Sequence, residues 1–275
     1  MPPQTSGSTA PGPERPLASY TSIAHVARVY DYLLGGKDNF AADREAAEQA
    51  MRINPDIVST ARANRAFGIR TTSYLVSQAG IRQFLDIGTG MPTNNNIHEV
   101  AQSIAPGSRI VYVDHDPIVS THARALLTSA PEGVTDYIEA DLREPEKILS
   151  EAARTLDFSL PVAIMLIAIL HLILDRDDPY DLVSQLVNAV VPGSYVVVSH
   201  AASDIDTGAM ISMANRLNEL MEQQAVPRTR QEIAHFFAGL DLLEPGLVRV
   251  PEWRPAAASD ALVHAQMWGA VGRKP

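Results

Sequence analysis

The sequence contains no cysteine, which excludes disulfide bonds, thiolate metal sites and a cysteine nucleophile. Positive charge is also scarce: 22 lysines and arginines stand against 32 aspartates and glutamates, a formal net charge of −10. No basic cluster interrupts this acidic balance, so we expect neither nucleic acid nor an anionic membrane surface as a partner. The lack of cysteine fits a cytoplasmic protein, and we expect that localisation.

Long hydrophobic runs and internal repeats are missing as well. The longest apolar run, Leu160 to Leu174, contains Pro161 and His171 and falls short of the roughly 20 residues that span a bilayer. We interpret it as a buried strand followed by a turn. Residues 1–20 are rich in proline, serine, threonine and glycine and lack the basic start and apolar stretch of a signal peptide, so we expect a disordered tail.

Residues 21–80 read as three helices. Ser22 is placed to cap the first, which ends at Gly35-Gly36, and an alanine-rich second helix runs from about Asp43 to Ile53. Asn54 is expected to cap the third, which reaches about Ala79. We expect this region to form an N-terminal helical lid on a domain that covers residues 81–275.

From residue 81 onward, apolar strand-like runs alternate with helical stretches. The expected strands are Gln83–Ile87, Arg109–Val113, Val134–Ala140, Pro161–Ile167 and Tyr195–Ser199, with two more at Leu247–Trp253 and His264–Gly272. The expected helices are Thr93–Ile104, Pro117–Ser129, Glu144–Leu156, Asp178–Val191 and Asp206–Gln223, and Thr229 to Glu232 has the spacing of a capping box. This pattern predicts an α/β fold, a Rossmann-like, mostly parallel sheet of seven strands with helices on both faces.

The stretch Phe84 to Gly90 is a strand that breaks into a Gly-x-Gly turn, and Asp86, Gly88, Thr89 and Gly90 are its candidate ligand contacts. Glycines there let the backbone approach a ligand at a helix N-terminus. The second strand ends in Asp114-His115-Asp116, where a carboxylate can accept hydrogen bonds from ribose hydroxyls. The third ends in Asp141-Leu142, suited to an adenine amino group. The competing interpretation is that these aspartates are helix caps or solvated loop ends, and capping is favoured for Asp116, which precedes Pro117.

A dinucleotide is the competing ligand for this turn. The NAD fingerprint requires a third glycine three positions after the second, and Thr93 stands there. A ligand without phosphates, such as S-adenosylmethionine, fits better, although an NAD-dependent oxidoreductase stays open as an alternative.

These motifs resemble the class I methyltransferases. A narrower resemblance covers nearly the whole chain beyond the tail: ARVYDYLLGGKDNFAAD from Ala27 to Asp43 is similar to the signature of an actinobacterial family of S-adenosylmethionine-dependent methyltransferases of unassigned substrate. Shorter matches are Asn64-Arg65-Ala66, Met91-Pro92-Thr93, His98-Glu99-Val100 and the ending WGAVGRKP.

The resemblance implies the seven-stranded sheet with a reversed C-terminal hairpin and S-adenosylmethionine as cofactor, and it implies no substrate. It assigns the ribose to Asp114 and the adenine to Asp141. His115, Leu142 and Ile167 complete the expected cofactor contacts on the strand ends. Arg65 or Lys37, from the lid, is expected to pair with the cofactor's carboxylate. The competing interpretation of the polar groups around Gly35-Gly36 is a helix end with a glycine C-cap and solvated charges.

An oxygen or nitrogen acceptor that starts protonated also needs a base. His171, after the fourth strand, and His200, at the end of the fifth, are the candidates by position, and both can equally be structural histidines. The histidines show no metal-ligand spacing, so we expect no metal. Met210, Met213, Leu217, Leu220 and Met221 form an apolar stripe at helical spacing, more typical of core than of a substrate wall.

Together these patterns predict a methyltransferase that acts on an oxygen or nitrogen of a small molecule, with a homodimer as the candidate assembly. A cofactor-binding sensor or scaffold without turnover is the second hypothesis.

Overall fold

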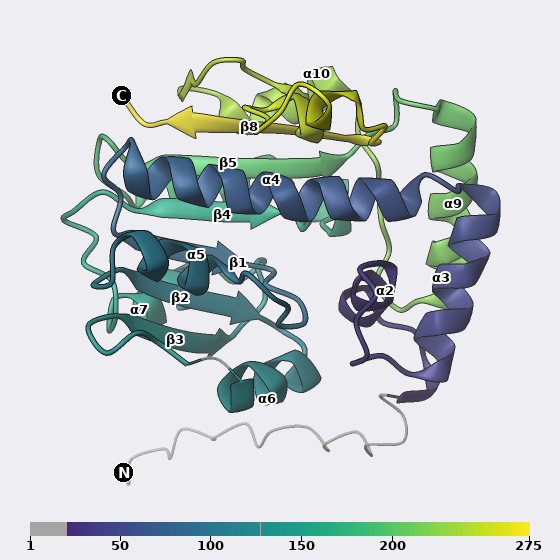
Figure 1. Ribbon diagram of the computed structural model, residues 1–275, viewed down its shortest axis with the longest axis horizontal. Coiled ribbons are helices and arrows are strands. Elements are labelled where there is room, and N and C mark those ends of the chain that lie inside the picture. Colours follow the sequence, from purple (N-terminus) through teal and green to yellow (C-terminus); the bar gives the residue numbers. More distant parts are fainter. Residues whose placement is uncertain (1–20, 127) are drawn as a thin grey trace, which may run out of the picture.

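In the computed structural model, which describes residues 21–126 and 128–275, the alternating half of the chain forms one sheet (Figure 1). The strands lie in the order β3-β2-β1-β4-β5-β8-β6, and β7 also pairs with β8. The five parallel strands are β1 (Gln83–Ile87), β2 (Arg109–Asp114), β3 (Val134–Glu139), β4 (Ala163–Ile167) and β5 (Tyr195–Ala201). Strand order reverses between β1 and β4, the position at which open α/β sheets bind ligands.

The C-terminal strands run against the rest of the sheet. β8 (Met267–Arg273) pairs antiparallel with β5, and the two-residue strands β6 (Asp241–Leu242) and β7 (Val248–Arg249) pair with β8 on its outer side. The sheet therefore has eight strands rather than the predicted seven. The predicted strand Leu247–Trp253 is shortened because Val250–Glu252 form a 3-10 turn around Pro251, a residue that has no N–H to donate to a ladder.

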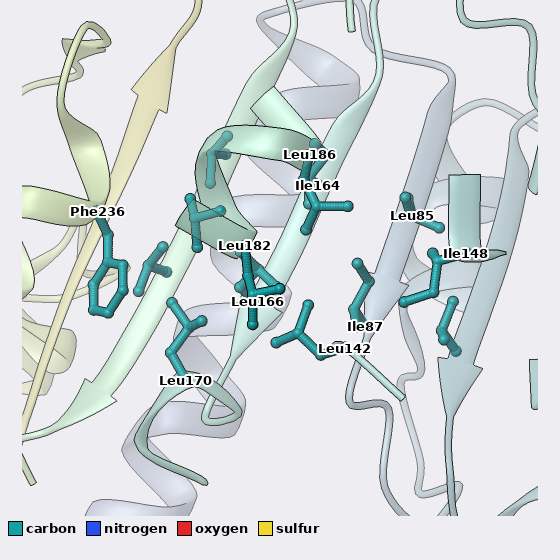
Figure 2. Packing of buried hydrophobic residues seen from close by; sticks show 14 of the residues in the cluster. Leu85, Ile87, Leu142, Ile148, Ile164, Leu166, Leu170, Leu182, Leu186 and Phe236 are labelled. Atoms are coloured by element: carbon teal, nitrogen blue, oxygen red, sulfur yellow. The ribbon is translucent and has the colours of Figure 1, made fainter. Parts of the chain in front are cut away.

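Helices cover both faces of the sheet. On one face α4 (Ile57–Ser77), α5 (Ile97–Ile104) and α6 (Pro117–Leu126) pack on alternate strand residues such as Phe84 and Met165. On the other, α7 (Pro145–Ala152), α8 (Pro179–Asn188) and the turn after α10 (Arg230–Ala234) pack on residues of the opposite parity, such as Leu85 and Leu166 (Figure 2). Because strand side chains alternate between faces, continuous apolar strands supply both cores.

Three helices form a cap beyond the carboxyl ends of the parallel strands (Figure 1). They are α2 (Val26–Leu33), α3 (Ala41–Ile53) and α9 (Thr207–Leu220), and their apolar faces meet in a cluster that includes Val29, Ala46 and Met221. The cap therefore joins segments from both halves of the chain. By contrast α4, which the sequence places in the lid, packs on the sheet through Phe67 and Leu75.

Two helix starts differ from prediction. His25 caps α2 in place of Ser22, because its Nδ1 accepts from Ala27 N at 3.3 Å. Asp56 rather than Asn54 precedes α4, and the Asn54 side chain is used elsewhere, donating to Gln266 Oε1 at 2.6 Å. The capping box that ends at Glu232 is present as predicted.

The predicted tail, residues 1–20, lies outside the described residues. Among the residues described, no helix combines the length and apolar character needed to cross a bilayer.

Candidate functional site

Two adjoining cavities lie where the carboxyl ends of β1, β2 and β4 meet the cap. The sheet-edge chamber, about 420 Å³, is lined by residues that include Asp141, Leu142 and Ile173. The cap chamber, about 230 Å³, lies under α2 and α9. Both are lined by Gly88, Asp114, His115, Ile169 and Leu172, so the end of β1 and the end of β2 form their common boundary.

The turn after β1 requires its glycines. Gly88 and Gly90 have φ of +77° and +66°, in the left-handed region that favours glycine. A Cβ at Gly88 would stand 2.5 Å from Cγ1 of Ile169, in the loop after β4. Gly88 N donates to Val113 O at 2.8 Å, and Thr89 Oγ1 donates to the same carbonyl at 3.2 Å. The turn is thus held against both neighbouring strands while its backbone faces the cavities.

Asp114 ends β2 beside this turn. Its Oδ2 accepts from Gly90 N at 2.8 Å and its Oδ1 accepts from Asp116 N at 3.0 Å, which fixes the carboxylate where both chambers meet. The neighbouring His115 side chain is 42% exposed, and its Nδ1 lies 3.7 Å from Asp114 Oδ1. Asp116 accepts from Ile118 N at 2.8 Å at the start of α6 and so has the predicted capping role.

Asp86 and Arg65 face the cap chamber from β1 and α4. Burial outweighs the lowering effect of Arg65 and, with a smaller contribution from Asp114, raises the pKa of Asp86 to about 7. Arg65 Nη2 donates to Asn95 O at 2.9 Å in the loop after the glycine turn, while its Nε is buried with no partner among the described residues. A ligand carboxylate would supply the missing acceptor. Lys37 is exposed and lines neither chamber, so the structure separates it from the predicted site.

Asp141 and Leu142 both line the sheet-edge chamber, whereas Ile167 lines the cap chamber. Burial opposes the ionisation of Asp141, but two hydrogen bonds from the Arg143 guanidinium, at 2.9 and 2.6 Å, outweigh it and lower the pKa of the carboxyl. Asp141 is therefore an ionised acceptor at the chamber wall.

His171 lines the cap chamber from the loop after β4. Burial, together with the charge of Arg228, lowers its pKa to about 4, so the imidazole is neutral at physiological pH. Its Nδ1 is buried without a partner among the described residues, and its carbonyl accepts from Val226 N at 2.7 Å. The side chain is thus a neutral imidazole on a fixed backbone.

His200 lines neither chamber, contrary to the expectation that its place at a strand end would aim it at the ligand. Its Nδ1 lies 2.8 Å from Ala201 O and its Nε2 lies 3.0 Å from Arg228 Nη1. Burial and neighbouring charges hold the pKa of His200 well below its ordinary value. With both ring nitrogens engaged, His200 has none left to take a proton from an acceptor.

Arg228 supports the site from behind, although it lines neither chamber and no sequence pattern points to it. It is 3% exposed and holds the loop after β4: Nη1 donates to Leu170 O at 3.0 Å, and Nη2 donates to Ile173 O at 2.9 Å and to Asp175 Oδ1 at 2.6 Å. This loop carries His171 and part of the wall of each chamber. Arg228 and the neutral His200 therefore position the loop.

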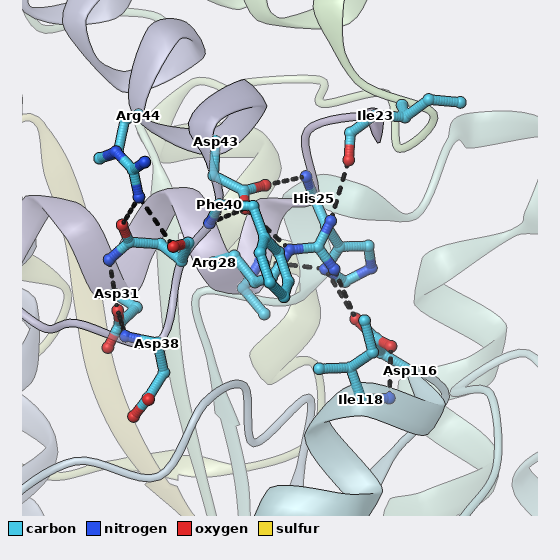
Figure 3. Close-up of polar contacts among 12 residues, drawn as sticks. Ile23, His25, Arg28, Asp31, Asp38, Phe40, Asp43, Arg44, Asp116 and Ile118 are labelled. Carbon is cyan, nitrogen blue, oxygen red and sulfur yellow. Dashed lines mark hydrogen bonds and ion pairs between the residues drawn. The ribbon is translucent and has the colours of Figure 1, made fainter. Parts of the chain in front are cut away.

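A buried charged cluster joins the cap to the end of β2 (Figure 3). Arg28, 2% exposed, donates through Nε to Asp43 at 2.9 Å and through Nη1 to Asp116 at 3.5 Å, and His25 Nδ1 lies 3.2 Å from the same Asp116 oxygen. Asp116, two residues after Asp114, thus anchors α2 directly and α3 through Arg28.

The polar motif after α2 is built into the cap. Asp31 accepts from Asp38 N at 2.9 Å and from Asn39 Nδ2 at 2.8 Å, and a Cβ at Gly36 would collide with the Asp31 carboxylate. The Gly-Gly-Lys-Asp-Asn run therefore forms a turn that is hydrogen-bonded to the end of α2.

One group of possible metal ligands has no local signature because its members are far apart in the chain. Asp56, Asp206 and His264 place one ligand atom each within 4.8 Å of one another at the surface, and His264 Nε2 already lies 2.9 Å from Asp206 Oδ2.

Comparisons with known proteins agree with this geometry. A family model described as S-adenosyl methyltransferase matches residues 15–275. A DUF574 family protein from Streptomyces avermitilis superposes with a TM-score of 0.90 at 45% identity over 93% of this chain and 99% of its own. A protein from Thermobifida fusca gives 0.86 at 40% identity over 94% and 98%.

An O-methyltransferase family protein from Burkholderia thailandensis shares the fold, with a TM-score of 0.51 at 16% identity over 82% of this chain and 62% of its own. No curated protein matches the chain. With its family model covering the sheet, the cap and both chambers, the chain belongs to the S-adenosyl methyltransferase family and is an S-adenosylmethionine-dependent methyltransferase.

Proposed function

We propose that the protein methylates an oxygen or nitrogen atom of a small molecule, with the adenosine of the cofactor in the sheet-edge chamber and the acceptor in the cap chamber. The observation that carries this proposal is the boundary at Gly88 and Asp114, which both chambers share. A cofactor lying across that boundary would present its methyl group to the chamber under the cap.

The residues present fit such a cofactor. Asp114 is placed for the ribose hydroxyls and Asp141 with Leu142 for the adenine, with His115 at the edge of the same chamber. Arg65, whose Nε is buried without a partner, would take the carboxylate of the methionine end, and Asp86 its ammonium. Gly88, Thr89 and Gly90 bring backbone rather than side chains to the ligand, and Ile167 adds apolar contact.

When bound, S-adenosylmethionine supplies an activated methyl group, so the chain need only align the acceptor, exclude water and remove a proton. Of the two histidines predicted as bases, only His171 lines a chamber, so we assign it the proton. An oxygen acceptor becomes a strong enough acid, as the new bond forms, to transfer its proton even to an imidazole of such low basicity.

The cofactor assignment is tested by calorimetry with S-adenosylhomocysteine. Asp114→Asn should weaken binding about tenfold or more, because a charge-assisted hydrogen bond is lost, and the exposed Asp181→Asn on α8 should bind as the wild type does. Stabilisation of the protein by NAD in place of S-adenosylhomocysteine would contradict the assignment.

Turnover is tested separately, with labelled S-adenosylmethionine and a metabolite extract. Transfer of label to an extracted compound, lost in His171→Ala while S-adenosylhomocysteine still binds, is the expected result. Tight cofactor binding without transfer to any compound would favour the sensor or scaffold hypothesis instead.

A further inference from the structure

The wall that the cap gives to the cap chamber is almost wholly apolar. From α2 come Val26, Ala27, Val29, Tyr30 and Leu33; from α9 come Met210, Met213, Ala214 and Leu217; and from the segment that follows come Met221, Ala225 and Pro227. Tyr30 is the sole hydrogen-bonding side chain in this set. The apolar stripe from Met210 to Met221, which the sequence pattern predicts to be core, therefore packs within the cap and also lines a cavity.

Three uncharged polar side chains that line this chamber, those of Tyr30, Asn64 and Gln266, already have hydrogen-bond partners within the protein. Tyr30 Oη donates to Ala61 O at 3.0 Å and accepts from Asn64 Nδ2 at 3.0 Å, while Asn64 Oδ1 accepts from Ser199 Oγ at 2.6 Å. Gln266 bonds to Asn54 through its oxygen and to Asp206 through its nitrogen, at 2.6 and 3.0 Å. None of these side chains needs a ligand to complete its hydrogen bonding.

The charges that line the chamber lie on its cofactor side. Asp86, Arg65 and Asp114 surround the glycine turn, where the cofactor brings charges of its own. Burial lowers the pKa of His25, so its imidazole adds no positive charge to the lining. An ionised acceptor entering under the cap would thus lose its hydration without gaining a counter-ion from the protein, which costs free energy that an uncharged acceptor would not lose.

From these contacts we propose, building on the methyltransferase function above, that the acceptor is an uncharged aromatic alcohol of phenol type whose ring lies against the methionines of α9 and whose hydroxyl faces His171. Thioethers suit this role because they adapt in shape and contact aromatic rings favourably. Alkylamines, which are cations in neutral solution, are excluded by the same missing counter-ion.

The methyl transfer then balances in charge. The acceptor oxygen forms the new O–C bond as the C–S bond breaks. The electron pair of the broken bond stays on sulfur, and the hydroxyl proton passes to His171. The positive charge moves from the sulfonium to the imidazolium, so the net charge of the enclosed site is the same before and after transfer. The low pKa of His171, about 4, keeps the imidazole free of a proton until then.

The test uses three probes that share one ring system: 2-naphthol, 2-naphthoate and 2-naphthylmethylammonium. Each is titrated calorimetrically into the complex with S-adenosylhomocysteine. We expect 2-naphthol to bind at least about tenfold more tightly than either ion. Equal or tighter binding of an ion, or binding of no probe to a complex that does form, would overturn the proposal. Absence of S-adenosylhomocysteine binding would instead contradict the proposed function beneath it.

A charge placed in the wall should reverse the preference. Met213→Lys supplies the counter-ion that the wall lacks, so 2-naphthoate should gain at least about tenfold over 2-naphthol relative to the wild type. Ile211→Lys, at an exposed position of the same helix, is the matched control and should change neither. An unchanged preference in a Met213→Lys protein that still binds S-adenosylhomocysteine would count against the proposal; the comparison in the wild type stands whether or not this variant folds.

Discussion

At the scale of single residues, Asp86 connects pH with stability. Its pKa is about 7 in the folded protein against 3.8 for an unperturbed carboxyl, so between these values the folded state holds a proton that the unfolded chain has lost. The free energy of unfolding therefore falls as pH rises from about 4 to 7 and is level above that range with respect to this group.

Asp86→Asn removes this dependence. At pH 8 the variant should be more stable than the wild type by up to about 4 kcal/mol, since each unit of pKa shift corresponds to about 1.4 kcal/mol. Urea denaturation at pH 5, 6, 7 and 8 measures it, with Asp181→Asn as the exposed control. Stability curves of the wild type and of the Asp86→Asn variant that stay parallel across the series would show that the carboxyl does not titrate there.

Arg228 offers the second residue-scale prediction. Arg228→Met removes the donor to the Ile173 carbonyl, at about 1 to 3 kcal/mol if that group stays buried, and frees the loop that carries His171. The Leu170 carbonyl also loses its bond from Arg228 but keeps the one from Ile173 N. We expect affinity for S-adenosylhomocysteine to fall as well as stability. Arg230→Met, which loses bonds to Leu247 O away from that loop, should lower stability alone. Equal affinity in both variants would contradict a positioning role.

The residues on strand ends could be predicted because strand order and side-chain alternation place them. Gly88 and Asp114 could be predicted because each comes at the end of an apolar run, and both line the cavities in the structure. His200 shows the limit of that reasoning: it ends a strand too, but its ring turns to Arg228. The direction of that ring depends on an arginine 28 positions later, which no local pattern reveals.

At the scale of elements, the turn after β1 is held by both backbone conformation and close packing, and two glycines separate these effects. Gly80 and Gly88 both have positive φ, +71° and +77°, but only at Gly88 would a Cβ meet a neighbour, Ile169. Gly80→Ala should cost about 1 to 2 kcal/mol of conformational strain. Gly88→Ala should cost more than that and abolish cofactor binding, as denaturation and calorimetry can measure. Similar losses in the two variants would mean that the contact with Ile169 gives way easily.

The docking of α2 depends on a buried ion cluster. Arg28→Met leaves the carboxylates of Asp43 and Asp116 buried without their main cation, an arrangement that typically costs about 3 to 5 kcal/mol, the range we expect here. Arg44→Met on α3 removes an exposed arginine whose contacts are to Asn39, and should cost less than about 1 kcal/mol. Chemical denaturation compares the two, and a similar small loss in both would show that the cluster contributes little to the stability of the cap.

The predicted bounds of helices and strands agree best with the structure where neighbouring residues alone determine them. β1 spans the predicted residues, Gln83–Ile87, because a mostly apolar run between turn residues leaves little choice of boundary. The outer strand of the C-terminal hairpin was overestimated, since Pro251 and Glu252 end it early. Ala24, just before the cap residue of α2, forms a bridge with Met221 from a distant part of the chain, a contact that could not be read locally.

At the scale of the molecule, the site exists because two distant segments meet over a sheet edge. Residues 21–53 and the helix Thr207–Leu220 share one apolar cluster, and together they convert the open carboxyl edge of the strands into a chamber. The sequence predicted a lid from the first segment but left the second as core, because its stripe of methionines is the same whichever surface it meets.

If the cap moves as one unit, cofactor binding should slow hydrogen exchange throughout the cap. Hydrogen exchange of the protein with and without S-adenosylhomocysteine should show added protection in the turn after β1 and in the loop from Leu170 to Asp175, because ligand contacts raise the cost of local opening. The added protection should also extend to α2, because Arg28 and Asp116 join this helix to the end of β2. It should reach α9 as well, because α2 and α9 share one apolar cluster. The helix α8, on the opposite face of the sheet, is the internal control and should exchange at the same rate in both samples. Protection confined to the sheet edge would show that the cap moves independently of the cofactor.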